Sequence, residues 1–101
     1  MGFHIEWTER AVENLKSIED YILADSEIQA KKVSGEIITY VDLLEDFPMM
    51  GRVVPEFPDL DLRELIKYSY RIIYSVEGNQ VYIVTIIHGK RDFKAAFLND
   101  K

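Results

Sequence analysis

The sequence predicts an α+β domain in which a short N-terminal strand and an antiparallel helical hairpin pack on one face of a small antiparallel β-sheet. Two stretches of helical periodicity fill most of residues 9–46. Two runs rich in β-branched and aromatic residues, 70–76 and 81–87, flank a short polar turn, which is typical of a β-hairpin. A chain of 101 residues has the length of one domain, so we assign residues 1–101 to a single domain.

The first helix is predicted by a capping residue and an apolar stripe. Residues 4–7, His-Ile-Glu-Trp, alternate weakly and predict a short strand before it. Thr8 follows, and its hydroxyl can accept a free backbone N–H at the start of a helix. The stripe consists of residues spaced four, three and four apart: Ala11, Leu15, Ile18 and Ile22. We therefore expect a helix from about Glu9 to Ala24.

The second helix is predicted to begin after Ser26, because Gln29 stands three residues further on and gives capping-box spacing. Its apolar stripe consists of Ala30, Val33, Ile37, Val41 and Leu44. Pro48 cannot continue the helix. Only a few residues join the two helices, which makes them antiparallel neighbours.

The segment 47–58 is loop-like, because it contains all three prolines of the chain and a glycine. Within it, Val53-Val54 predicts a short edge pairing. Residues 63–68 predict a strand that turns tightly into the hairpin, and residues 93–97 predict a last helical turn. Two helices can cover only one face of the sheet, so we expect the other face to present exposed apolar area or a groove.

The turn of the hairpin sets its register. Residues 78–79, Gly-Asn, tolerate the positive φ that a two-residue turn requires. Such a turn places Val76 opposite Val81.

Continuing this register along the strands places Arg71 opposite Ile86. Because side chains alternate between the faces of a strand, Arg71 and His88 should then share a face as diagonal neighbours, roughly 7–8 Å apart. An arginine beside an imidazole at the end of an apolar sheet is the first indication of a site.

Composition limits the chemistry. The chain has no cysteine, which excludes disulfides and thiolate metal sites, and its two histidines argue against a zinc site. It has no glycine-rich phosphate loop, so we expect neither a metal nor a small-molecule cofactor. The N-terminus lacks a signal-peptide pattern, and no apolar run approaches the ~20 residues of a membrane helix. These features are compatible with a cytoplasmic protein, which we expect.

The formal net charge of −6 argues against direct binding to nucleic acid, for which a basic face is usual. The charge is uneven. Residues 8–46 hold ten acids and four bases, whereas residues 62–94 hold six bases and three acids. Two readings remain open: two ordinary solvated surfaces, or a polar site on the sheet that faces an acidic partner or a phosphate.

The chain resembles the ParE branch of the RelE/ParE superfamily of toxin–antitoxin toxins nearly from end to end. The residues that carry the resemblance are Trp7-Thr8 with Ala11, Leu15, Ile18 and Tyr21-Ile22, then Phe47-Pro48, Gly51-Arg52, Val54-Pro55-Glu56, Arg63-Glu64-Leu65, Tyr70-Arg71-Ile72-Ile73-Tyr74 and His88-Gly89-Lys90-Arg91-Asp92. The resemblance implies the fold predicted above and a protein antitoxin as partner, with which we expect a complex.

Three functions follow from the resemblance. A ParE-like toxin would bind a protein target, DNA gyrase by family resemblance, and would need no catalytic residue. A RelE-like toxin would cleave messenger RNA on the ribosome, with Glu56 as base, Arg71 as the cation and His88 as acid. The third is a non-toxic member that acts only with its antitoxin.

The same residues have structural alternatives. Glu56 could pair with an arginine of the sheet, Arg63 could pair with Glu64 or Glu56, and Arg71 could brace the sheet end. The residues expected to contact phosphates or acids of a partner are Arg52, Arg63, Arg71 and Arg91.

Overall fold

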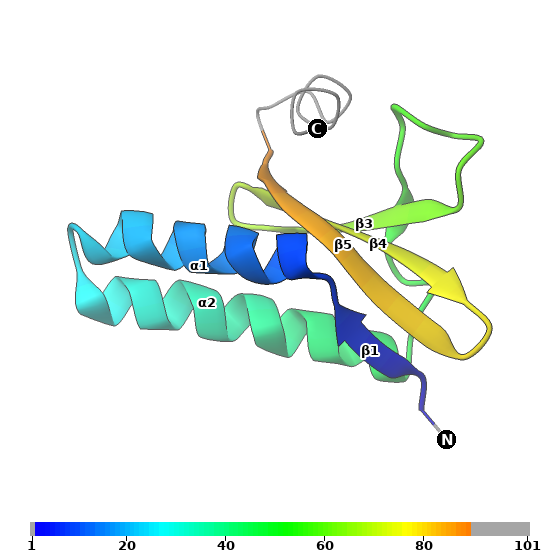
Figure 1. Cartoon of the computed structure of the whole chain (residues 1–101), viewed down its shortest axis with the longest axis horizontal. Coiled ribbons are helices and arrows are strands. Elements are labelled where there is room, and N and C mark those ends of the chain that lie inside the picture. Colours follow the sequence, from blue (N-terminus) through cyan, green and yellow to red (C-terminus); the bar gives the residue numbers. More distant parts are fainter. Residues whose placement is uncertain (1, 90–101) are drawn as a thin grey trace.

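The structure, a computed structural model, describes residues 2–89 (Figure 1). The elements follow in the order β1 (His4–Trp7), α1 (Glu9–Leu23), α2 (Glu27–Asp42), the 3-10 helix η1 (Leu43–Glu45), β2 (Arg52–Val53), β3 (Leu62–Lys67), β4 (Tyr70–Glu77) and β5 (Gln80–His88). The two helices run side by side along one side of the sheet (Figure 1). The last helical turn predicted at residues 93–97 lies outside the described residues.

The five strands described form one sheet in the order β1-β5-β4-β3-β2, which confirms the predicted fold class. The pairs β2–β3, β3–β4 and β4–β5 are antiparallel, as expected for strands joined by short turns. β1 pairs with β5 in parallel. The parallel direction of β1 was not predicted. β1 and β5 are far apart in the sequence, so no short turn between them indicates how they pair.

Thr8 joins the edge of the sheet to the first helix. Its side chain accepts a hydrogen bond from the Ala11 amide (3.1 Å), the predicted cap of α1. The same hydroxyl lies 2.9 Å from the backbone oxygens of both Ile83 and Val84 on β5, to which it can donate. Ser26 caps α2 in the same way by accepting from the Gln29 amide at 3.1 Å.

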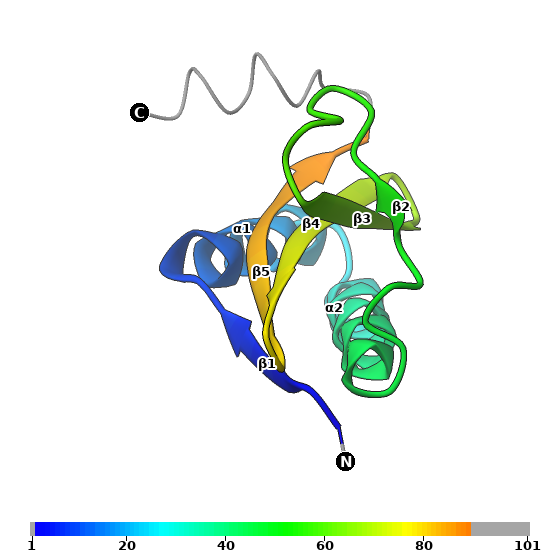
Figure 2. The same ribbon diagram turned by 90° about the vertical axis from the view of Figure 1, so that its right-hand side faces the viewer.

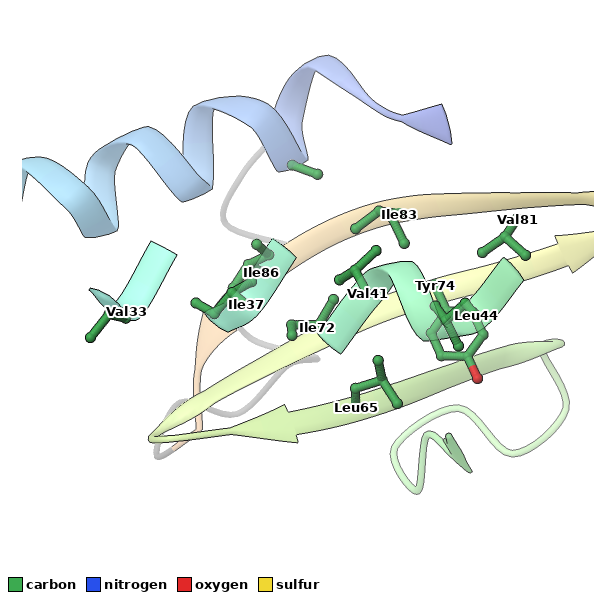
Figure 3. Packing of buried hydrophobic residues seen from close by; sticks show 11 residues of the cluster. Val33, Ile37, Val41, Leu44, Leu65, Ile72, Tyr74, Val81, Ile83 and Ile86 are labelled. Atoms are coloured by element: carbon green, nitrogen blue, oxygen red, sulfur yellow. The ribbon is translucent and has the colours of Figure 1, made fainter. Parts of the chain in front are cut away.

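The main core lies between the helices and one face of the sheet (Figure 3). Its buried residues are Ala11, Val33, Ile37, Val41, Leu44, Leu65, Ile72, Tyr74, Val81, Ile83 and Ile86. The predicted apolar stripe of the second helix therefore supplies much of this core. Neither helix within residues 2–89 is long and apolar enough to cross a membrane.

The opposite face, on which we expected exposed apolar area or a groove, is partly covered. A second, smaller cluster contains Val54, Ile73 and Ile87, with Phe57 and Leu62 packed against it. Loop residues after β2 thus act as the cover that a further helix would otherwise provide.

The hairpin between β4 and β5 begins in the predicted register. Gly78 has a φ of 62°, and Val76 lies opposite Val81. The register then shifts at a β-bulge: Ile73 pairs with Thr85, but Tyr74 pairs with Ile83, which leaves Val84 as the extra residue.

The bulge overturns the prediction for Arg71 and His88. Arg71 lies opposite Ile87 instead of Ile86, and His88 lies opposite Tyr70. Residues directly opposite share a face, and neighbours along a strand alternate. Arg71 and His88 therefore project from opposite faces of the sheet.

The turn between β3 and β4 carries the one positive φ of a non-glycine residue among those described, 56° at Tyr68. A bulky residue seldom adopts this conformation. Its hydroxyl donates to Oε1 of Glu36 on α2 at 2.5 Å, and Nζ of Lys67 lies 3.7 Å from the same oxygen. The hydrogen bond with Tyr68 lowers the pKa of Glu36 and raises the pKa of Tyr68. The turn is thereby attached to the second helix.

Candidate functional site

Arg71 is the centre of a buried ion-pair network on the face of the sheet opposite the helices. It lies on β4, and only 6% of the residue is exposed. Its two terminal nitrogens donate to the two carboxylate oxygens of Glu56, Nη1 to Oε2 at 2.7 Å and Nη2 to Oε1 at 2.8 Å. Such a bidentate pair is among the stronger polar contacts in proteins. The structural alternative for Glu56, a pair with an arginine of the sheet, is therefore confirmed.

Glu64 on β3 extends the network. Its side chain is fully buried, and Oε1 accepts from Nε of Arg71 at 2.6 Å. Its other oxygen, Oε2, accepts from Nε of Arg52 on the edge strand β2. Glu64 thus joins three strands through its two oxygens, which leaves no carboxylate oxygen of this residue unpaired.

Among residues 2–89, the network is electrically balanced. Its two arginines face two carboxylates, so these four side chains together have no formal charge. The hydrogen bonds that Arg71 makes with Glu56, and then those with Glu64, raise the pKa of Arg71 above its already high ordinary value. Arg71 is therefore a permanent cation whose charge is compensated within the fold.

Arg52 is the exposed member of the network. Its side chain is 60% exposed, compared with 8% for Arg71. A hollow of about 250 Å³ lies beside it. The residues that line this hollow are Arg52, Pro55, Glu56, Ile66, Tyr68, Ser69, Arg71 and Gly89. Of the two cations, Arg52 is the more accessible to a partner.

His88, at the end of β5, lies on the other face of the sheet. Its ring packs edge-on against the Tyr70 ring, with centroids 5.8 Å apart and planes at 77°. It lines a second hollow of about 380 Å³, together with Asn14, Ser17, Ile18, Tyr21, Tyr70, Ile86 and Ile87. The three residues considered for RNA cleavage are therefore not gathered in one site: Glu56 and Arg71 are together, and His88 is on the other face.

Arg63 holds the loop before β2. It donates from Nη1 to the backbone oxygen of Gly51 at 2.7 Å. The predicted alternatives, pairs with Glu64 or Glu56, are wrong for this residue, because both carboxylates are taken by other arginines.

Tyr74 on β4 binds the same loop before β2 through its hydroxyl group. Its hydroxyl accepts from the Gly51 amide at 2.9 Å and donates to the Pro48 oxygen at 2.8 Å. Burial raises the pKa of Tyr74, which keeps the donating proton in place. A Cβ at Gly51 would lie 2.6 Å from the Glu64 backbone oxygen and 2.7 Å from the Tyr74 hydroxyl oxygen, so only glycine fits there.

The sequence predicted for Glu64 only a pair with the adjacent Arg63, and it predicted no role for the Tyr74 hydroxyl. The available signal for Glu64 was an acid at a strand position whose neighbours on the same face are apolar or basic. Arg91, the remaining cation predicted to contact a partner, lies outside the described residues. Within residues 2–89, no group of three or more histidine, aspartate or glutamate side chains is placed to hold a metal ion.

Comparison with known proteins identifies the family. The family described as ParE toxin of type II toxin-antitoxin system, parDE, matches residues 5–93. The chain belongs to this ParE toxin family. A curated relative, Toxin RelE2 of Caulobacter vibrioides, is 35% identical over 88 residues, which cover 86% of this chain and 96% of that protein. The chain is thus a type II toxin of the ParE/RelE superfamily.

Solved structures agree on the fold of this ParE-family chain. The chromosomal ParDE system of P. aeruginosa matches with a TM-score of 0.72 at 22% identity, over 85% of this chain and 95% of that one. A mutant of the E. coli toxin RelE in the free state matches with a TM-score of 0.67 at 15% identity, over 95% and 93%. The toxin–antitoxin complex RelBE2 of Mycobacterium tuberculosis matches with a TM-score of 0.58 at 17% identity, over 87% and 99%.

Proposed function

We propose that this toxin inhibits growth by binding a protein target, DNA gyrase by its resemblance to ParE toxins, and that a cognate antitoxin neutralises it by binding. The proposal requires binding surfaces and no catalytic group.

The observation that supports it most is the separation of the residues needed for RNA cleavage. General acid–base cleavage needs its base, its cation and its acid around one phosphate. Here Glu56 is engaged by both terminal nitrogens of Arg71, while His88 packs on Tyr70 across the sheet. A phosphate that reached Arg71 would first have to displace Glu56, and a proton from His88 would have to come from the other face.

An antitoxin partner is supported by the family and by the solved neighbours. The P. aeruginosa match is a ParDE toxin–antitoxin system, and the M. tuberculosis match is a toxin–antitoxin complex. The arginines expected to meet such a partner differ in access. We propose Arg52 as the contact residue, and we propose that Arg71 has a bracing role.

The test is induced expression of the chain without its antitoxin, with separate measurements of the DNA-damage response and of transcript integrity. We expect growth arrest and induction of the SOS response with intact transcripts. Cleavage of transcripts at ribosomal positions would instead support the RelE-type alternative, and absence of any growth effect would support the non-toxic alternative.

A pair of histidine variants sharpens this test. His88→Ala removes the candidate acid, and His4→Ala changes an exposed histidine on β1 as a matched control. We expect both variants to keep the SOS response of the unaltered chain. An activity that His88→Ala reduces by a factor of about 100 or more, while His4→Ala leaves it unchanged, would indicate general acid catalysis and contradict the proposal.

A further inference from the structure

The strand β2 is an edge with unused backbone groups. It is the last strand in the described sheet order, and Figure 2 shows it at the outer margin of the sheet. The Val54 amide donates to the Leu62 oxygen at 3.0 Å. In antiparallel pairing, hydrogen-bonded positions alternate with positions whose N–H and C=O point away from the partner. Val53, opposite Arg63, therefore directs its N–H and C=O away from β3.

A hollow lined by apolar side chains and by the charged Asp61 and Arg63 lies beside Val53. Its volume is about 190 Å³. The residues that line it are Met49, Val53, Pro58, Leu60, Asp61, Leu62, Arg63 and Val76. Three of its apolar side chains are exposed, Met49 by 58%, Val53 by 47% and Leu60 by 51%. The hollow can therefore receive an apolar side chain at this edge.

A second hollow, lined by charged side chains, lies beside the neighbouring residue of the same strand. Arg52 lines this hollow of about 250 Å³ together with Arg71 and the carboxylate of Glu56. The contact between Arg52 and Glu64 is made through Nε, which leaves the terminal amino groups of this exposed guanidinium available to a further carboxylate. Consecutive residues of β2 thus border two different hollows.

We propose that β2 is the docking edge for an extended segment of the cognate antitoxin in which acidic and apolar residues alternate. The segment would add a strand to the sheet and pair with the backbone of Val53. Its side chains would alternate between the two faces, an apolar one beside Val53 and an acidic one beside Arg52.

The antitoxin is the occupant that fits these observations. A free strand edge beside exposed apolar side chains is prone to pairing with other chains, and a stably bound antitoxin would cover it. The exposed cation of the edge, Arg52, complements an acid on the added strand. This inference rests on the proposed function only in taking the antitoxin as the partner.

The test is hydrogen exchange of individual backbone amides in the isolated toxin and in its complex with the antitoxin. We expect the Val53 amide to exchange roughly 100-fold more slowly in the complex, because it gains a hydrogen bond. The Val54 amide is the internal reference, since its bond to Leu62 exists in both states.

Two variants test the edge independently. Val53→Pro removes the outward N–H while the Val54 bond to β3 remains, and Arg52→Glu reverses the charge beside it. We expect each variant to weaken antitoxin binding by about tenfold or more. Lys16→Glu, a charge reversal at an exposed position of α1, is the control and should leave the affinity within about twofold. Melting temperatures verify that the variants are folded.

The outcomes separate this inference from the proposed function. If the antitoxin binds and neutralises the toxin while the Val53 amide exchanges as in the isolated chain, the docking edge is wrong and the toxin assignment stands. If the antitoxin does not bind at all, both fail. Protection of Val53 that rises with toxin concentration alone would assign the edge to a second copy and also overturn the inference.

Discussion

Replacement of Glu64 by glutamine tests whether the ion-pair network stabilises the fold. Glutamine keeps the shape of the side chain and one carbonyl oxygen, but it removes the charge and puts an N–H₂ group where an arginine donates. Glu64 is fully buried and accepts from two arginines. Glu64→Gln therefore leaves one of these donors facing another donor and leaves Arg71 with Glu56 as its charge partner.

The magnitude follows from burial. Removing one partner of a buried ion pair costs about 3–5 kcal/mol. Because glutamine keeps one acceptor and Arg71 keeps the bidentate pair with Glu56, we expect the lower end, about 3 kcal/mol. For a domain of this size each kcal/mol lowers Tm by about 4–8 °C, so the expected fall in Tm is roughly 12–24 °C.

The assay is urea unfolding followed by far-UV circular dichroism, with thermal melts as a second measurement. Glu27→Gln is the matched control, since its carboxylate lies 3.3 Å from Lys31 and both side chains are at least 70% exposed. It should change the free energy of unfolding by less than about 0.5 kcal/mol. A loss below about 1 kcal/mol for Glu64→Gln would refute the reasoning that burial makes this carboxylate essential to the fold.

Three further predictions concern the loop before β2, the turn between β3 and β4, and a contact between α1 and β5. Gly51→Ala should destabilise the fold by about 2 kcal/mol in urea unfolding, because its Cβ would meet a backbone oxygen at 2.6 Å. Tyr68→Phe should lower Tm near neutral pH by removing the bond to Glu36. The difference in Tm between the variant and the unaltered chain should shrink as pH falls below 4.5, because Glu36 becomes protonated as pH passes its lowered pKa. It should also shrink as pH rises above 10, because Tyr68 loses its proton as pH passes its raised pKa. A Tm difference that does not change with pH would contradict this. Asn14→Ala should cost about 1–2 kcal/mol, because its side-chain oxygen accepts from the Ile86 amide at 3.0 Å; an unchanged urea midpoint would contradict this.

The parts of the fold that could be predicted from sequence are those with local causes. Thr8 and Ser26 cap their helices where the sequence places them. Gly78 takes the positive φ that its turn needs, and the first pairs of the hairpin follow from it. Each of these features depends on residues within a few positions of one another, so the sequence carries the whole signal.

The parts that could not be predicted depend on contacts between distant segments. The bulge at Val84 has no glycine to mark it, and a contact from Thr8 accompanies it: the Thr8 hydroxyl meets the oxygens of Ile83 and Val84. A register counted from the turn is reliable up to the bulge and is off by one residue beyond it. That single residue is sufficient to move Arg71 and His88 to opposite faces.

The same network also explains why the exposed and buried arginines should differ in role. Arg71 donates from three nitrogens to the carboxylates of Glu56 and Glu64 and is buried, so a further ligand there would have to break these ion pairs. Arg52 is fixed at Nε by the buried Glu64 while most of its side chain remains in solvent. A guanidinium held at one end loses less conformational entropy when it binds a carboxylate at the other. In the proposed docking at the β2 edge, burial of Glu64 and Arg71 would therefore serve binding indirectly, because it fixes the orientation of the cation that the partner would meet.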